Sequence, residues 1–338
     1  MRHSLLIAGL LVTALLLFGC GSDKPSEPVT PKPQRIVVTQ GTAAPSMDNP
    51  EATVWNGITP TAVDLSTTLA PTPAVAGVTA IADSVYVQAL TFHDTLYLRV
   101  RWADNSHSVW RGAYTVRDTS DSLAGQPVTY FNAPDSVGRQ EDQLWVLFAG
   151  LASGDWDGLN WRALTTDSTF LAEGINLHRA TTSDPWDQVK DEGTLEVYRA
   201  NKDLINAGYP AYFHEDTSSY HGYTLFENDN LRTLDFFIRG WDLGQTVPYY
   251  ILDSTKFRLP AATRGSRWDT RTISDYAPLG AERPEYTVVL CRPMNTGYTD
   301  DVVLTDSVKT KIGVFDNQMD INVGGTGRGF TKEFWLIF

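Results

Sequence analysis

The chain has few cysteines and a shortage of basic residues, and each shortage excludes a class of protein. Only two cysteines, Cys20 and Cys291, occur among the 338 residues, so neither a disulfide-rich secreted scaffold nor a cysteine-based zinc site can form. The 27 Lys and Arg residues are outnumbered by 40 Asp and Glu residues, which gives a net charge of −13. Nucleic acid binding requires a basic surface, so we expect no nucleic acid partner.

Catalytic signatures are also missing. The sequence contains no Gly-x-Ser-x-Gly nucleophile elbow, no His-Glu-x-x-His motif, no phosphate-binding loop and no dinucleotide-binding fingerprint. We therefore predict a protein that is not an enzyme by itself.

The amino-terminal segment is typical of an exported lipoprotein. One arginine, Arg2, precedes an apolar run of about fifteen residues, which is the layout of a signal peptide and is short for a membrane-spanning helix. The run ends in Leu17-Phe18-Gly19-Cys20, a lipobox. We predict a signal peptide over residues 1–19 and a lipid on Cys20, which would anchor the exported protein in a membrane.

A proline-rich segment follows the lipobox. Residues 20–34 contain four prolines and almost no large apolar side chains, a composition that cannot bury a core and is typical of a disordered tether. Gly21 stands where an aspartate would favour retention at the inner membrane. We expect the protein at the outer membrane or on the periplasmic face of a membrane.

Strand patterns dominate the rest of the chain. Residues 84–90 and 96–102 alternate around a short polar turn and predict a hairpin, with Leu96, Leu98, Val100 and Trp102 on one face. Further apolar runs predict strands at 143–148, 286–291, 311–315 and 333–338. Helical periodicity is scarce, and only 187–204 could hold a helix.

These patterns indicate one all-β domain over residues 35–338. Many short strands and few helices favour an antiparallel β-sandwich. Its middle, about 150–232, is long and polar, and we interpret it as an irregular insertion of loops.

A set of phrases in a fixed order resembles a known family. The phrases are Pro-Glu-Ala-Thr-Val-Trp at 50–55, Leu-Arg-Val-Arg-Trp-Ala-Asp at 98–104, Glu-Asp-Gln-Leu at 141–144, Val-Pro-Tyr-Tyr-Ile-Leu at 247–252, Arg-Gly-Ser-Arg-Trp-Asp at 264–269, Tyr-Thr-Val-Val-Leu-Cys-Arg-Pro-Met-Asn-Thr-Gly at 286–297, Asp-Asp-Val at 300–302 and Gly-Val-Phe-Asp-Asn at 313–317. Together they are similar to the haem-binding domain of the gamma subunit of ethylbenzene dehydrogenase and of related cytochromes, a group that includes subunits of molybdenum enzymes of the dimethyl sulfoxide reductase type. The resemblance covers nearly all of the domain.

The resemblance implies a fold, a cofactor and partners. The fold would be a sandwich akin to DOMON domains and to one class of carbohydrate-binding module. The cofactor would be haem b in a pocket between the sheets, with methionine and lysine as axial ligands. The partners would be respiratory oxidoreductase subunits or multihaem cytochromes.

This sequence departs from the family at the expected ligands. Between Leu144 and His178, where the family places its methionine or a Cys-x-x-Cys-His motif, there is neither Met nor Cys. The phrase at 175–180 stands where the family has a phrase ending in lysine-alanine. The haem could therefore be bound differently in this chain, or lost.

Histidine and methionine supply the remaining candidates, since haem iron takes His, Met, Cys or Lys as ligands. We select His178, His214 and Met319 as candidate haem ligands; His178 lies where the family builds its pocket. His93 and His107 are expected to be exposed. We set three further residues aside. His221 lies in the same middle region as His214, and Met47 and Met294 are better explained by packing.

Two other kinds of site remain open. Asp155, Asp157, Asp300 and Asp301 could bind calcium through their carboxylates, although their spacing does not match an EF-hand loop. The tryptophans Trp156, Trp161 and Trp186 could form a platform for sugar stacking, although tryptophans are more often core residues.

Two functions follow from these patterns. The leading hypothesis is a haem-binding, electron-transfer lipoprotein that serves a respiratory redox system. The alternative is a haem-free sandwich that binds a ligand or a carbohydrate at the cell surface.

Overall fold

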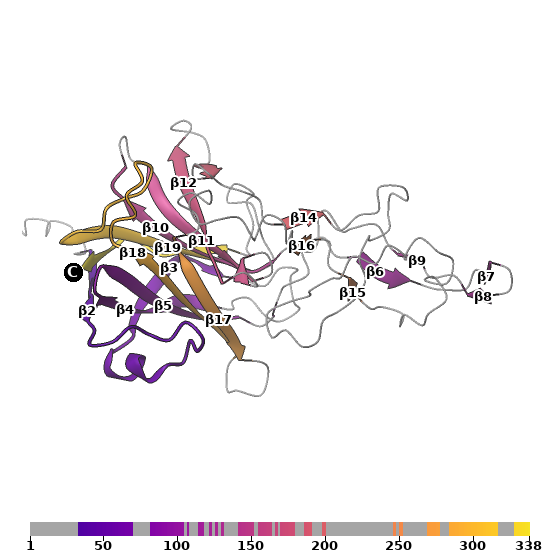
Figure 1. Cartoon of the computed structure of the whole chain (residues 1–338), viewed down its shortest axis with the longest axis horizontal. Coiled ribbons are helices and arrows are strands. Elements are labelled where there is room, and N and C mark those ends of the chain that lie inside the picture. Colours follow the sequence, from indigo (N-terminus) through magenta and orange to yellow (C-terminus); the bar gives the residue numbers. More distant parts are fainter. Residues whose placement is uncertain are drawn as a thin grey trace, which may run out of the picture. The chain divides into compact units, whose positions relative to one another are not determined.

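Two β-sheets contain most of the strands that the structure describes (Figure 1). The computed structural model describes residues 33–69, 82–104, 107, 141–151, 155–163, 166–167, 170–179, 269–277, 284–316 and 328–338, with short strands elsewhere. Among the described residues, no helix is long and apolar enough to cross a membrane.

Sheet A contains eight strands. Its path is β1 (Gln34–Val37), β21 (Phe334–Ile337), β19 (Ser307–Phe315), β10 (Gln143–Ala149), β11 (Trp156–Arg162), β12 (Glu173–Arg179) and β13 (Trp186–Lys190), and β20 (Arg328–Phe330) also pairs with β19. All described pairs are antiparallel except β1 with β21.

Sheet B contains six strands. Its path is β17 (Arg271–Ala277), β18 (Glu285–Pro293), β5 (Thr95–Ala103), β4 (Ala82–Phe92) and β2 (Thr39–Gln40), and β3 (Thr61–Leu69) also pairs with β4. The predicted hairpin is β4 with β5, in antiparallel register from Tyr86–Arg101 to Phe92–Thr95.

Four smaller groups complete the described elements. They are the paired strands β14 (Tyr198–Ala200) and β16 (Tyr250–Leu252), β6 (Tyr114–Arg117) with β9 (Tyr130–Phe131) and β15 (Thr246–Val247), β7 (Ser122–Leu123) with β8 (Gln126–Pro127), and the 3-10 helix η1 (Thr53–Gly57).

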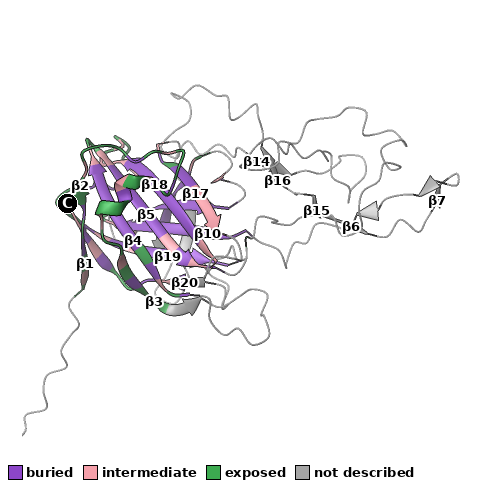
Figure 2. Cartoon of the chain, turned by 90° about the horizontal axis from the view of Figure 1, so that it is seen from below, coloured by how far each residue is buried: buried purple, intermediate pink, exposed green. Residues whose placement is uncertain are grey.

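One hydrophobic core lies between the two sheets. Sheet B contributes the inward-facing row Leu96, Leu98, Val100 and Trp102, as the alternation predicted, and sheet A contributes rows such as Leu144, Val146 and Phe148. All these side chains are at most 2% exposed, and Figure 2 shows the strands of both sheets as mostly buried. The antiparallel sandwich predicted from the strand patterns is confirmed.

The prediction of a helix over 187–204 is wrong in the part that the structure describes. β13 and β14 fall in this range, and β13 pairs with β12 from Ile175–Lys190 to Arg179–Trp186. Pairing with a neighbouring strand outweighs a weak helical period, because tertiary contacts override local helix propensity.

The amino-terminal strand belongs to both sheets. β1 pairs in parallel with β21, and after Val38, whose N–H donates to the carbonyl of Ile337 at 2.8 Å, β2 pairs in parallel with β4. One continuous segment therefore closes one edge of the sandwich.

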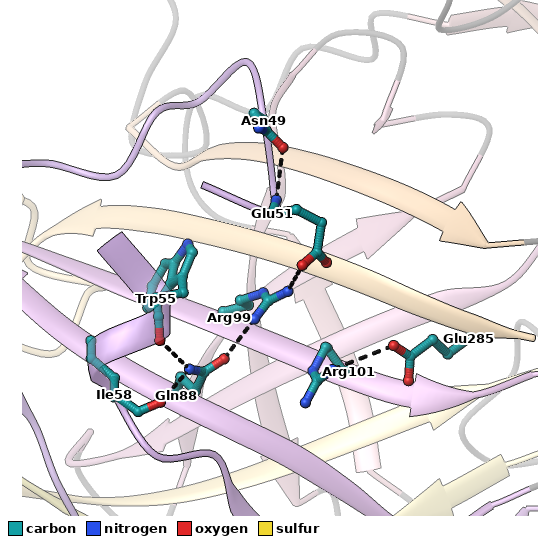
Figure 3. A network of polar contacts seen from close by, with 8 residues as sticks. All are labelled: Asn49, Glu51, Trp55, Ile58, Gln88, Arg99, Arg101 and Glu285. Carbon is teal, nitrogen blue, oxygen red and sulfur yellow. Dashed lines mark hydrogen bonds and ion pairs between the residues drawn. The ribbon is translucent and has the colours of Figure 1, made fainter. Parts of the chain in front are cut away.

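The outer face of sheet B is covered by the segment 41–58. Arg99 on β5 donates to Gln88 at 2.9 Å and forms an ion pair with Glu51, while the Gln88 amide donates to the carbonyls of Trp55 at 2.9 Å and Ile58 at 2.6 Å (Figure 3). These bonds hold the Trp55 ring, which is 1% exposed, over an apolar patch of sheet B.

Cys291 lies in the same patch under this segment. Its thiol is buried, and burial raises its pKa. The free cysteine is therefore an inert packing residue, since only the thiolate reacts readily.

Candidate functional site

Three aspartates gather at one end of the sandwich. Each is two positions away from an inward-facing core residue of its strand. Asp104 follows Trp102 on β5, and Asp142 precedes Leu144 on β10. Asp316 follows Val314 on β19. Side chains of a strand alternate between its faces, so each aspartate extends an inward-facing row by one step. They are 1%, 0% and 1% exposed, and a carboxylate oxygen of each lies within 4.8 Å of the others. We call this the acidic end.

A buried tyrosine joins this end to the aromatic core. Tyr286 on β18 is 1% exposed, and its hydroxyl donates to Oδ2 of Asp142 at 2.8 Å. Its ring stacks on Trp102 at 4.9 Å between centroids and meets the edge of Trp161 at 5.4 Å. The hydrogen bond crosses from sheet B to sheet A, so Tyr286 links the two sheets.

Two further rings extend this cluster outward. Tyr276 on β17 lies 4.8 Å from the Tyr286 ring, and His107 stacks on Tyr276 at 5.0 Å and 13°. His107 is exposed, as the sequence predicted, and yet one face of its imidazole is covered by Tyr276.

The electrostatics of this end keep its aromatic groups neutral. Burial, followed by the charges of Asp142 and Asp104, raises the pKa of Tyr286 well above its ordinary value. Burial and the same kind of carboxylate repulsion raise the pKa of Tyr276 to about 12. The rings of Tyr276 and Tyr286 cover part of the otherwise exposed His107 imidazole, and this partial burial lowers its pKa, against the pull of Asp167 and Asp275.

The opposite end of the core holds a buried ion pair. Arg292 on β18 and Asp157 on β11 are 2% and 1% exposed, with 2.7 Å between the guanidinium Nη1 and the carboxylate Oδ2. The same Asp157 oxygen accepts the N–H of Val302 at 2.8 Å, and Arg292 donates to the carbonyl of Val302 at 2.9 Å. Burial raises the pKa of Asp157, and Arg292 opposes that rise.

The outer face of sheet A carries a second apolar cluster. Its buried members are Trp145, Leu147, Trp156, Ile175, Leu177 and Phe315. Gly158 lies among them, where a Cβ would approach Leu147 Cδ2 to 2.6 Å and Ile175 Cγ1 to 3.1 Å. Polar side chains border this cluster at Asn160, Arg162 and Glu173, and Arg162 pairs with Glu173 at 3.2 Å.

The predicted haem ligands are only partly placed. His178 lies in β12, opposite Asp187 of β13 and next to Leu177 of the outer cluster. Its side chain lies outside the described part, as do His214, His221, Met319 and Cys20. His93 is exposed in the β4–β5 turn, and Met47 and Met294 pack against the two core clusters as expected.

The structure places Asp157, Asp300 and Asp301 near enough for their charges to interact, but it joins neither the predicted calcium residues nor the predicted sugar residues into one site. Among the described residues, the group of three carboxylates close enough to share an ion is the acidic end, and it includes none of Asp155, Asp157, Asp300 or Asp301. Trp156 and Trp161 lie on opposite faces of β11, at 7% and 0% exposure, so they form no common platform. The side chain of Trp186 is outside the described part.

Sequence reasoning missed the acidic end, although its residues lie in phrases that resemble the family. The signal was the alternation itself: counting one more inward step past Trp102 and Val314, or one step back from Leu144, reaches an aspartate each time. What the sequence could not supply was the pairing that brings three strand ends together.

Comparisons with known proteins complete this description. None of the curated proteins matches the chain. A candidate carbohydrate-binding protein from Bacteroides uniformis ATCC 8492 is similar at 9% identity and a TM-score of 0.33, over 90% of this chain and 91% of that one. A carbohydrate-binding module of family 9 from Caldicellulosiruptor kristjanssonii, in complex with glucose, is similar at 7% identity and a TM-score of 0.32, over 90% and 95% of the two chains.

The model of one protein family, described as ethylbenzene dehydrogenase, matches residues 52–324. That range contains the acidic end, the buried ion pair and the middle strands of both sheets. The chain therefore belongs to the ethylbenzene dehydrogenase family.

Proposed function

We propose that this chain is a haem-binding, electron-transfer lipoprotein that serves a respiratory redox system and has no catalytic activity alone. Family membership over residues 52–324 carries the proposal. A bound haem b would supply a centre that is reduced and oxidised by one electron at a time. The chain's own residues would bind it, exclude water and set its ligands.

The space between the sheets does not fit a haem in the described part. Side chains of the core fill it, among them Trp102, Trp161, Phe148 and Tyr286, each at most 1% exposed. Protein cores are packed to the density of organic crystals, so a porphyrin there would have to displace several rings.

A second apolar surface lies on the outer face of sheet A. Its cluster of Trp145, Leu147, Trp156, Ile175 and Leu177 offers the apolar floor that a porphyrin needs. Gly158 lies within that floor, where the side chains of Leu147 and Ile175 close over its backbone. These side chains are at most 7% exposed, so a porphyrin on this face would likewise have to displace side chains, and neither apolar surface of the described part is open to haem.

His178 is our first candidate for an axial ligand. It lies in β12, opposite Asp187 of β13. Histidine is a common haem ligand, and His178 lies in the phrase at 175–180, which stands where the family has a phrase ending in lysine-alanine. His214 and Met319 remain candidates for the second ligand.

The partners and the location belong to the same proposal. A lipid on Cys20 would hold the protein in a membrane, at the outer membrane or on the periplasmic face. Electrons would pass to or from respiratory oxidoreductase subunits or multihaem cytochromes. Palmitate-analogue labelling tests the anchor: Cys20→Ser should lose the label and the membrane fraction.

Titration of the purified full chain with haemin tests the cofactor. We expect stoichiometric binding with a Soret band that sharpens and shifts on reduction by dithionite. His178→Ala, His214→Ala or Met319→Leu should weaken or shift that band if the residue is a ligand. His93→Ala is the matched control, because His93 is exposed in a turn of sheet B. Absence of stoichiometric haem at micromolar concentration contradicts the proposal.

A second candidate function is the binding of a neutral, hydroxyl-bearing ligand such as a carbohydrate. Asn160 on the outer face of sheet A is 0% exposed, and neither its amide nitrogen nor its oxygen has a hydrogen-bond partner among the residues that the structure describes; Nε of the neighbouring Arg162 also has none there. A buried polar group left unpaired costs about 1–3 kcal/mol, and hydroxyl groups could pair with both.

A glycan-binding screen on the haem-free chain tests this alternative. Asn160→Leu keeps a similar volume and removes the amide, so it should abolish binding of any glycan held there. Retained binding in that variant contradicts this role for Asn160.

A further inference from the structure

We propose that the acidic end contains a redox-active tyrosine, Tyr286, at the centre of an aromatic path that carries single oxidising equivalents between the core and the surface. This function is independent of haem binding. It rests on a continuous series of rings, on a proton acceptor bonded to the tyrosine, and on the surrounding carboxylates.

The rings form an unbroken series across the sandwich. Trp161 and Trp102 have centroids 6.1 Å apart, Trp102 and Tyr286 4.9 Å, Tyr286 and Tyr276 4.8 Å, and Tyr276 and His107 5.0 Å. Electron tunnelling decays exponentially with distance, so neighbouring rings in contact exchange electrons far faster than separated ones. Trp161 is 0% exposed and His107 is exposed, so the path joins the interior to solvent.

Tyr286 has the feature that a reversible tyrosine radical requires. A phenol that loses an electron becomes a strong acid and must give up its proton at once. The Tyr286 hydroxyl donates to Asp142 Oδ2 at 2.8 Å, and both residues are buried. The proton can therefore move along an existing hydrogen bond without leaving the protein.

The step balances in charge and atoms. A one-electron oxidant, such as a photogenerated ruthenium(III) complex, takes one electron from Tyr286. The phenolic O–H bond breaks, the proton forms an O–H bond with the Asp142 carboxylate, and a neutral phenoxyl radical remains. Return of one electron from a reductant reverses both changes.

The neighbouring groups favour this chemistry at Tyr286. The carboxylates of Asp142 and Asp104 place negative charge near the Tyr286 hydroxyl, and negative charge lowers the free energy needed to remove an electron. Within the described part of the chain, Trp102 Nε1 has no hydrogen-bond partner, so an oxidised Trp102 has no acceptor there for its proton and passes the oxidation on. Trp102 therefore relays the oxidising equivalent, and Tyr286 retains it.

Flash photolysis of the haem-free full chain with ruthenium tris-bipyridine and a sacrificial quencher tests the proposal. We expect electron paramagnetic resonance to detect a long-lived neutral tyrosyl radical. Tyr286→Phe, which keeps the ring and removes the hydroxyl, should lose that component. Tyr86→Phe is the matched control, because Tyr86 is 42% exposed on β4 and outside the series; it should leave the component unchanged.

Asp142→Asn separates a redox role from a structural one. The variant keeps the shape of the side chain and an acceptor for Tyr286, yet it is too weak a base to take the phenolic proton, so the radical's lifetime should fall. A long-lived component that persists in Tyr286→Phe overturns the proposal. If circular dichroism shows that Tyr286→Phe does not fold, an unchanged lifetime in Asp142→Asn overturns it instead.

Discussion

Replacing one partner of the buried ion pair is the most direct test of how the two sheets are held together. Arg292→Met removes the guanidinium from β18 and leaves the Asp157 carboxylate on β11, 1% exposed, with only the N–H of Val302 as a described donor. Methionine keeps most of the volume and the flexibility of arginine. The change therefore removes charge while it retains packing against Phe148, over which the guanidinium lies at 5.3 Å.

The expected magnitude follows from burial. Breaking a fully buried pair by removing one partner costs about 3–5 kcal/mol, since the remaining charge is neither paired nor solvated. Replacing both partners with apolar residues of similar volume is often nearly neutral. We therefore expect Arg292→Met to lower the free energy of unfolding by about 3 kcal/mol or more, and Arg292→Met with Asp157→Leu to recover much of that loss.

Urea unfolding of the four chains at neutral pH gives the double-mutant cycle. The cycle isolates the coupling between the two side chains as the part of their effects that is not additive. We expect a coupling above about 2 kcal/mol, beyond the range of exposed ion pairs. Additive effects, or a single-variant loss below about 1 kcal/mol, the value typical of an exposed pair, would refute the argument that this contact is desolvated.

Three further predictions address other parts of the fold. Burial raises the pKa of Asp301 to about 6 from 3.8, so the folded state binds the Asp301 proton more tightly than the unfolded state, and stability falls as the pH rises between these values. Asp301→Asn should remove that fall and stabilise the chain at pH 7 by about 1–2 kcal/mol after allowance for partial exposure. Unfolding at pH 4 and pH 7 measures the effect, and an equal effect at both pH values would contradict the prediction. Gly158→Ala should cost about 1–3 kcal/mol in thermal unfolding, because the added methyl group overpacks the outer face of sheet A, and an unchanged melting temperature would show that Leu147 moves aside freely. Glu51→Gln should increase limited proteolysis within 41–58, where Arg99 holds the segment, and cleavage like that of the parent chain would count against that role.

The strands that alternate over several residues were predictable from the sequence. The hairpin at 84–102 became β4 and β5, and the runs at 286–291, 311–315 and 333–338 became β18, β19 and β21. In each, the pattern of inward apolar side chains is local and long enough to fix both the element and its buried face.

Long-range pairing was not predictable in the same way. The parallel pairs of β1 with β21 and of β2 with β4 join the two ends of the chain or cross a sheet. The four residues of β1 do not determine which strand it pairs with. The acidic end was not predicted for the same reason: its three aspartates lie at the ends of three strands, and only the order of the strands in the sheets brings them together.

The candidate site was predicted from single residue types rather than from geometry. His178, His214 and Met319 were selected for the chemistry of their donor atoms, and they stay predictions. Tyr286 was visible as part of a strand, yet its hydrogen bond to Asp142 depends on the approach of the two sheets. A reading of residue types alone cannot supply such a distance.

The amino-terminal strand that crosses from sheet A to sheet B has a mechanical consequence. A pull on the chain ahead of Gln34, directed along the strand, loads the hydrogen bonds of β1 against β21 and of β2 against β4 at the same time, in shear. Bonds loaded together in shear resist far more force than bonds opened one by one from an end. The segment that enters the domain is thus also the one best placed to bear load, so tension on a membrane anchor would reach both sheets before any strand peeled away.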